Sequence, residues 1–186
     1  MSSLALELLA KRIFSESFTL LLKIRELMKT YPTIIDPMVG LDALNNLSCC
    51  YTKFDHHVMA LKTLEDALKM IHERKLDEGI AYTYINLCSV YSSMKRHSKA
   101  IEYGQLGIAQ LEKEISRLNC DTCDLATFRS AFVERVRLLT IAYYSIGVEC
   151  LKLDVYDLCS KYLEKADLCL KNFLVSDHNY KKLEAE

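Results

Sequence analysis

Apolar residues recur three and four positions apart along most of the chain, which is the spacing of one face of an α-helix. The pattern predicts a helical region from about Ser2 to Thr30, interrupted near Ser15. Tyr31-Pro32 and Asp36-Pro37 end that region, because the residue before a proline disfavours helical backbone. Further helices are predicted at residues 38–53, 56–74, 77–94, 97–118, 122–152 and 155–174. The remaining segment, 176–186, is polar and is expected to fray.

Short carboxylates precede two of these predicted helices. Asp55 and Asp154 each stand directly before a run of periodic apolar residues. A side-chain oxygen at this position accepts hydrogen bonds from the first backbone N–H groups of a helix. We therefore expect both aspartates to be helix N-caps.

An internal repeat runs through these helices. In each copy, the first helix carries two large residues, then a small residue, then an aromatic residue at most of the aligned positions. The second helix carries a small residue, a variable residue and another small residue. The aligned residues are Leu44, Leu47, Ser48, Tyr51, Ala60, Leu64 and Ala67; then Tyr84, Leu87, Cys88, Tyr91, Ala100, Gly104 and Gly107; then Tyr143, Ile146, Gly147, Cys150, Cys159, Leu163 and Ala166. Small residues at the Ala60 position let the two helices of a hairpin approach closely, while the large residues fill the space between hairpins. The repeat predicts three antiparallel helical hairpins.

At these residues the chain resembles the tetratricopeptide repeat (TPR) family. The stretches are "ALNNLSCCYTKFDHHVMALKTLEDALKM", "AYTYINLCSVYSSMKRHSKAIEYGQLGIA" and "AYYSIGVECLKLDVYDLCSKYLEKADLCL". The resemblance implies an all-α fold, a right-handed superhelical solenoid of antiparallel helical hairpins. Two positions depart from the family pattern: Cys150 replaces the usual aromatic residue, and Gly104 replaces a large one.

The repeats suggest a division of the chain into five parts. These are an N-terminal capping helix or half repeat (1–31), TPR-like repeats at 38–75 and 77–118, a third repeat with an extended first helix (122–175), and a polar tail (176–186). The spacing from Ala60 to Ala100 is 40 residues and from Ala100 to Cys159 is 59, both longer than the family's common period of about 34.

Two segments outside the regular repeats carry apolar faces that must be covered. The N-terminal face comprises Phe14, Ser17, Leu21, Ile24 and Leu27, and the face of the long helix comprises Leu125, Phe128, Phe132 and Val136. The first is expected to cap the open end of the first hairpin, or else to be the end of an array completed by another chain. The second is expected to fold onto the preceding helix around Leu111, Ile115 and Leu118, or else to project as a partner surface.

Composition narrows the class of protein further. Five Gly and two Pro in 186 residues are too few to punctuate a sandwich or barrel of short strands. The 24 basic and 25 acidic residues leave a net charge of −1, which argues against a dedicated nucleic-acid binder. Six of the eight Cys lie within apolar periodic stretches, as small buried hydrophobes do. Because no apolar run approaches 18 residues and no secretory signal pattern is present, we expect a reduced, cytoplasmic compartment and no membrane partner.

Candidate chemistry is sparse in the sequence. Cys120 and Cys123 have ligand-like spacing, but structural zinc needs four ligands and no second Cys or His pair lies nearby. A plain pair of loop thiols is expected, with zinc or a disulfide as the alternatives. His56-His57 falls at the predicted turn of the first hairpin, where a solvated histidine is expected. No zinc-protease, phosphate-loop or nucleophile-elbow motif is present, so the chain is predicted not to be an enzyme and to need no metal or cofactor.

The polar positions on the first helices predict a partner surface. In solenoids of helical hairpins these helices line the concave face. In the resembled family the position of Asn46 and Asn86 faces the groove and often carries Asn. The predicted groove residues are Asn45, Asn46, Cys49, Lys53, Asn86, Ser89, Ser93, Ser145 and Lys152. A merely solvated polar stripe is the alternative. The predicted packing residues are Leu47, Tyr51, Ala60, Leu87, Tyr91, Ala100, Ile146, Gly147 and Cys159.

These patterns favour a non-catalytic scaffold or adaptor that binds a peptide or helical segment of a protein partner and is part of a larger complex. The alternatives are a regulatory domain or subunit of an enzyme, and a helical-repeat nucleic-acid binder. The stretches "AYTYINLCSVYSSMKRHSKAIEYGQ" and "LLTIAYYSIGVECLKLDVYDLCSKYLEKA" are also similar to kinesin-light-chain-like and ciliary TPR proteins. That similarity implies a cytoskeletal or ciliary location as the narrower prediction.

Overall fold

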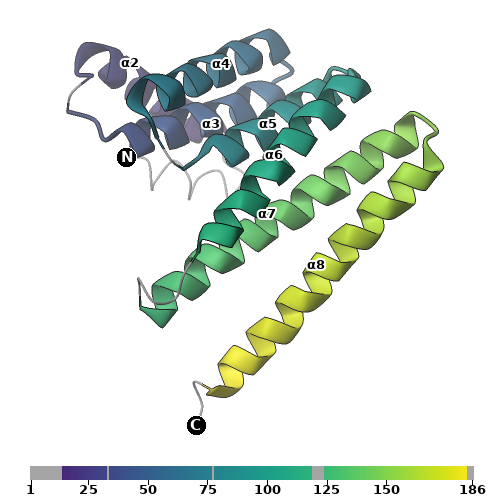
Figure 1. Cartoon of the computed structure of the whole chain (residues 1–186). Coiled ribbons are helices and arrows are strands. Elements are labelled where there is room, and N and C mark those ends of the chain that lie inside the picture. Colours follow the sequence, from purple (N-terminus) through teal and green to yellow (C-terminus); the bar gives the residue numbers. More distant parts are fainter. Residues whose placement is uncertain (1–13, 33, 77, 119–123, 184–186) are drawn as a thin grey trace. The chain divides into compact units, whose positions relative to one another are not determined.

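The computed structural model describes residues 14–32, 34–76, 78–118 and 124–183, and these residues form helices and short turns without any strand (Figure 1). The helices are α2 (Phe14–Thr30), α3 (Pro37–Lys53), α4 (His57–Arg74), α5 (Ile80–Ser93), α6 (His97–Arg117), α7 (Leu125–Lys152) and α8 (Tyr156–Leu183). The prediction of an all-α fold is confirmed. The predicted helical residues 2–13 lie outside the described part of the chain.

Two helix boundaries differ from the prediction. Helix α5 begins at Ile80 rather than near residue 77, because Gly79 adopts a left-handed backbone (φ 87°) directly before it. A side chain at Gly79 would also collide with Leu41 of α3. Helix α8 continues to Leu183, so residues 176–183 are helical and are not a frayed tail. No Gly or Pro interrupts the sequence from residue 155 onward, and an ion pair between Lys171 and Asp167 (2.6 Å) supports this helix.

The chain divides into two compact units, Met1–Lys95 and Arg96–Glu186, and each is described by itself. In the first unit α3 packs against α2 and α4, and α5 packs against both α3 and α4. In the second unit α7 packs against both α6 and α8. The boundary between the units falls inside the second predicted hairpin, between α5 and α6.

The core of the first unit lies between α3 and α4. Its buried cluster is Leu41, Leu44, Ala67 and Ile71, with Met28, Met38, Leu68, Met70, Leu76 and Ile80 packed around it. Helix α2 buries Leu21 and Ile24 and places Phe18 edge-on against Tyr51, with ring centroids 5.2 Å apart. The apolar face of α2 is therefore covered by α3.

In the second unit the long helix α7 is covered on two sides. Its first half lies along α6, where Arg135 Nε is 3.4 Å from Glu114 Oε2 and Val136 is buried. Its second half lies against α8, where Gly147 permits a close approach: a Cβ at this position would stand 2.8 Å from Leu163 Cδ2. The extra length of α7 thus packs along the preceding helix.

The same backbone turn recurs at the three aligned positions of the repeat. Asp55, Lys95 and Asp154 all have left-handed backbone, with φ values of 63°, 57° and 59°. Their N–H groups donate to Thr52, Ser92 and Leu151, so each residue closes the end of the preceding helix. These turns are 40 and 59 residues apart, which are the spacings found between the repeats in the sequence. The backbone therefore repeats at the same intervals as the sequence pattern.

This turn corrects the expectation that Asp55 and Asp154 are N-caps. The N-cap of α4 is His56, which makes no side-chain capping hydrogen bond. The Asp55 carboxylate instead lies 2.9 Å from His57 Nε2, and Asp154 Oδ1 accepts a hydrogen bond from Tyr156. A left-handed residue that closes one helix stands one position too early to cap the next, and aspartate is among the residues that tolerate this backbone.

Most predicted packing residues are buried. These are Leu47, Tyr51, Ala60, Leu87, Ala100, Ile146, Gly147 and Cys159, while Tyr91 is half-buried. Replacing Ala60 with leucine should overpack the α3–α4 contact and lower the free energy of unfolding by about 1–3 kcal/mol. Urea denaturation measures this, with Val58→Leu at an exposed position of the same helix as the control. An unchanged midpoint for Ala60→Leu would contradict the hairpin packing.

Candidate partner-binding surface

Two equivalent stripes of residues run along α3 and α5. Their members stand 40 residues apart: Asp42, Asn46, Cys49 and Lys53 on α3, and Tyr82, Asn86, Ser89 and Ser93 on α5. The spacing of four, three and four residues places each stripe on one face of its helix. Because α3 and α5 pack against each other, the two stripes belong to neighbouring helices of one unit.

The asparagines of this surface are not exposed, which corrects the expectation that Asn46 and Asn86 face solvent. Their exposed fractions are 5% and 8%, and Asn45 is fully buried. Asn45 Nδ2 donates to Leu41 O (3.2 Å) and Thr83 Oγ1 (3.1 Å), and Asn45 Oδ1 accepts from Asn86 Nδ2 (2.9 Å). A buried amide needs partners for its donors and its acceptor, and the neighbouring helix supplies them. Asn45 and Asn86 therefore join α3 to α5.

The exposed members of the stripes are Asp42, Lys53, Ser89 and Ser93, and Cys49 and Tyr82 are half-buried beside them. Cys49 Sγ is 3.7 Å from Asn86 Oδ1, and burial raises the pKa of this thiol. A thiol held neutral is a weak hydrogen-bond donor and not a nucleophile. The surface therefore offers one carboxylate (Asp42), one flexible cation (Lys53) and two short hydroxyl groups, which suit ion pairing and hydrogen bonding to a partner better than covalent chemistry.

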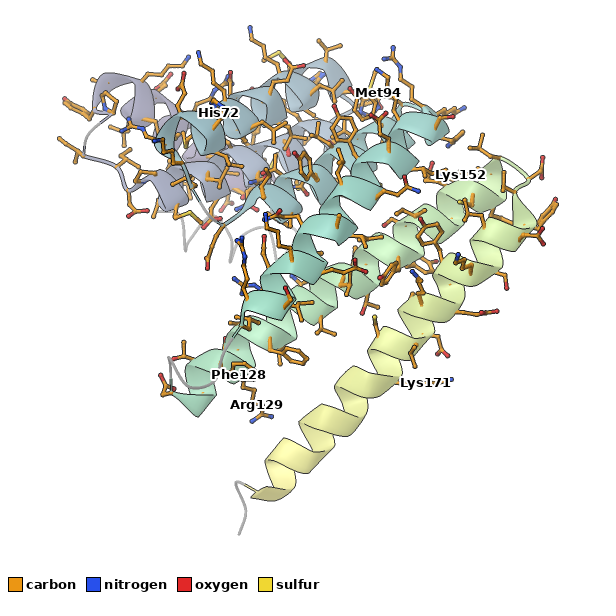
Figure 2. The ribbon with its side chains drawn as sticks, viewed as in Figure 1. His72, Met94, Phe128, Arg129, Lys152 and Lys171 are labelled. Carbon is orange, nitrogen blue, oxygen red and sulfur yellow. The ribbon has the colours of Figure 1, made fainter. Side chains whose placement is uncertain are left out.

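The two predicted groove residues of the third repeat lie in the second unit. Ser145 is half-buried on α7, and Lys152 is the last residue of that helix (Figure 2). Lys152 Nζ is bound at 2.7 Å by Glu149 Oε1, and Glu149 Oε2 is 2.6 Å from His97 Nδ1 at the start of α6. The carboxylate of Glu149 is almost completely buried. Lys152 thus helps to neutralise a buried charge.

Sequence reasoning missed this His97–Glu149–Lys152 cluster. A signal for it exists, because Glu149 stands between Val148 and Cys150 in an otherwise apolar run of α7. Buried carboxylates are paired with cations or hydrogen-bond donors. The sequence could have indicated that Glu149 has a partner, but not that the partner is His97, 52 positions away.

A tyrosine also joins helices within the second unit. Tyr143 of α7 is buried, its hydroxyl donates to Glu112 Oε1 of α6 (2.7 Å), and Lys165 of α8 lies over its ring. Burial, together with the hydrogen bond to Glu112, raises the pKa of Tyr143 well above its ordinary value. Tyr143 therefore packs between helices of the second unit with its hydroxyl bonded.

Replacing Tyr143 with phenylalanine should cost about 1.5 kcal/mol at pH 7, because a hydrogen bond to a charged acceptor is lost. The raised pKa means that the folded state favours the neutral phenol. The contribution of the Tyr143 hydroxyl to the free energy of unfolding is therefore complete below the unfolded pKa of about 10. It is lost as the pH rises toward the pKa of the folded state. Urea unfolding at pH 7 and pH 10.5 should show the gap between Tyr143→Phe and the natural chain narrowing. A gap that widens with pH would contradict this role; Tyr144→Phe at the exposed neighbouring position is the control.

The first unit also contains a pocket of about 310 Å³ between α2, α3 and α4. Its apolar wall includes Met28, Ile35, Leu44 and Met70. The charges at its rim are largely paired: Arg25 binds Asp66 at 2.8 Å, and Lys69 Nζ lies 3.7 Å from Glu73. The rim of the pocket therefore has no excess of positive or negative charge that would attract an ion or a charged cofactor.

The part of the chain that the structure describes contains neither a cluster of metal ligands nor a membrane-spanning helix. No group of three or more His, Cys, Asp or Glu side chains there could hold a metal ion. No described helix is both long and apolar enough to cross a membrane. Cys120 and Cys123 lie outside the described residues, so the interpretation of that pair stays a prediction.

Comparisons with known proteins bear on the fold. No family model matches this sequence, and no curated protein matches it. Among solved structures, the chain is similar to the nearly identical TPR-like repeats of a Podosopora anserina protein assigned as a kinesin light chain. The TM-score is 0.51 at 16% identity, over 92% of this chain and 93% of that one. The crystal structure of MamA also matches, with a TM-score of 0.41 at 17% identity over 89% of this chain and 94% of that one. The fold is thus a TPR-type helical repeat, and the resemblance drawn from the sequence is confirmed at this level.

Proposed function

We propose that this chain is a non-catalytic protein-interaction module that binds an extended or helical segment of a partner protein on the exposed face of α3 and α5. The observation that carries the proposal is the pair of equivalent stripes on these helices, in which four side chains remain exposed: Asp42, Lys53, Ser89 and Ser93. Hydroxyl groups and a lysine can bond to backbone carbonyls and to carboxylates of a partner. The first-helix position of both stripes is also the concave side in helical-hairpin solenoids.

The buried asparagines support this proposal indirectly. Since Asn45 and Asn86 fix α3 against α5, the exposed residues above them are held on a rigid base. A preorganised surface loses less conformational entropy when it binds. We therefore assign partner contact to the exposed stripe members and a positioning role to the asparagines.

A cytoskeletal or ciliary location belongs to the same proposal. It is supported by the similarity of two sequence stretches to kinesin-light-chain-like proteins, and by a fold likeness to TPR-like repeats of that kind. Fluorescence microscopy of the tagged chain in ciliated cells tests this location, and co-localisation with microtubules or axonemes is expected. A diffuse signal that disappears when soluble protein is extracted would contradict it.

Site-specific photo-crosslinking in cells tests the binding surface. A benzoylphenylalanine at Ser93 should form a covalent adduct with a partner protein, because Ser93 is exposed at the end of the α5 stripe. The matched control places the same group at Lys69 on α4, which is also exposed but stands outside both stripes. Adducts that form equally at both positions, or only at Lys69, would contradict the assigned surface.

A further inference from the structure

A second surface of the molecule is apolar and exposed. On α7, Ile141, Tyr144, Val148 and Leu151 follow a spacing of three, four and three residues, which places them on one face. Tyr144 and Leu151 are 59% and 50% exposed. On α8, Leu163 and Leu170 are seven residues apart and are also exposed. We call these six residues the α7/α8 face; it ends near Lys152, which Figure 2 labels.

The repeat identifies an equivalent face in the first hairpin. The turns at Asp55 and Asp154 share the same left-handed backbone and the same pattern of closing hydrogen bonds, which fixes a register of 99 residues. In this register the α7/α8 face corresponds to Asp42, Asn45, Cys49 and Thr52 on α3 and to Leu64 and Ile71 on α4.

The structure shows what covers that equivalent face. Helix α5 packs against both α3 and α4, with Asn45 bonded to Thr83 and with Ile80 packed against the cluster that contains Ile71. Leu64 and Ile71 are accordingly 0% and 6% exposed, whereas their counterparts Leu163 and Leu170 are 36% and 46% exposed. A helix thus packs on the part of this face where Asn45, Leu64 and Ile71 are buried. Asp42 stays exposed at its edge, and Cys49 and Thr52 are half-buried.

The chemistry of the two faces differs in one informative way. In the first hairpin the polar side chains of Asn45 and Cys49 face α5. Asn45 is hydrogen-bonded to Thr83 of α5, and Cys49 is hydrogen-bonded to Asn86. The third hairpin presents Tyr144 and Val148 at the same places. A helix that covers the third hairpin therefore needs apolar side chains where α5 has Thr83 and Asn86.

We propose that the α7/α8 face binds an amphipathic α-helix of a partner protein, seated on α7 and α8 as α5 is seated on α3 and α4. The bound helix carries apolar residues at the positions equivalent to Thr83 and Asn86. This surface is separate from the stripes of α3 and α5, so the inference goes beyond the proposed function and does not depend on it.

The test uses a helix whose sequence is known. A fluorescein-labelled peptide of residues 79–95 with Thr83→Leu, Asn86→Leu and Cys88→Ala is titrated with the full chain, and fluorescence anisotropy is recorded. Saturable binding is expected, and the same peptide with Thr83 and Asn86 retained should bind at least tenfold more weakly. In the protein, Tyr144→Glu with Leu151→Glu should weaken binding of the first peptide at least tenfold.

Matched variants make the result specific. Leu106→Glu, at an exposed apolar residue of α6, should leave binding unchanged. Tyr144→Gln with Leu151→Gln removes the apolar surface without adding charge and should weaken binding as well. Circular dichroism verifies that each variant keeps its helical content.

Three outcomes would overturn the proposal. The first is the absence of saturable binding by the leucine-containing peptide. The second is equal binding by the natural chain and by the Tyr144→Gln, Leu151→Gln variant. The third is a dimer in sedimentation velocity that the Tyr144→Glu, Leu151→Glu variant converts to a monomer, because the occupant would then be a second copy of this chain.

Discussion

Replacing Asn45 with alanine should lower the free energy of unfolding by about 3 kcal/mol, one of the two largest effects expected of changes in this chain. The side chain makes three hydrogen bonds at a fully buried position between α3 and α5. Its removal takes the acceptor from Asn86 Nδ2, and a buried polar group left unsatisfied costs about 1–3 kcal/mol. The Thr83 hydroxyl keeps its bond to Gly79 O but loses the one it accepts, and the missing side chain also leaves a void. Urea denaturation followed by circular dichroism measures the loss.

The control for Asn45 is Ser89→Ala on the exposed part of the same surface, which should change stability by less than about 0.5 kcal/mol. If Asn45→Ala costs no more than Ser89→Ala, the asparagines do not hold α3 to α5. They would then again be candidates for direct partner contact, as the sequence alone predicts.

Removing the two partners of Glu149 should have an effect of similar size. His97→Ala with Lys152→Ala takes two partners from a buried carboxylate, and breaking a buried pair in this way costs about 3 kcal/mol. Adding Glu149→Leu to the same variant removes the buried charge itself. The triple variant should therefore be more stable than the double variant, because apolar replacement of a whole buried ionic cluster is often close to neutral.

The comparison of double and triple variants separates electrostatics from packing. If the triple variant is less stable than the double variant, Glu149 is held mainly by contacts other than those with His97 and Lys152. A loss of stability that is the same for His97→Ala alone and for the double variant would show that Lys152, whose side chain is 41% exposed, contributes little.

The sequence predicts helices more reliably than it predicts side-chain roles. Helices α3 to α7 begin and end within about three residues of the predicted positions, because the apolar period and the prolines act locally. The end of α8 was missed because the polar composition of residues 176–183 suggested a tail, whereas no helix-breaking residue is present there. The left-handed Asp55 and Asp154 were missed because an aspartate before a helix fits both an N-cap and a closing turn residue.

The candidate surface was predicted only in part. The spacing of Asn46, Asn86 and their neighbours placed them correctly on α3 and α5. It could not show which of two adjacent asparagines turns toward the neighbouring helix, because that depends on how α5 packs on α3. In the same way Glu149 and His97 meet through packing of α7 on α6, which no local pattern contains.

The most direct test of the proposed function is calorimetric titration of the full chain with the partner segment that crosslinks to position 93. The account predicts binding that Ser89→Arg with Ser93→Arg weakens at least tenfold, because bulky cations would then fill the exposed stripe of α5. A variant with Lys69→Glu and Glu73→Lys on α4 should bind as the natural chain does, since these exposed residues stand outside both stripes. Unchanged affinity of the Ser89→Arg, Ser93→Arg variant, together with weakened binding by the Lys69→Glu, Glu73→Lys variant, would contradict the claim that the α3/α5 surface is where this module binds its partner.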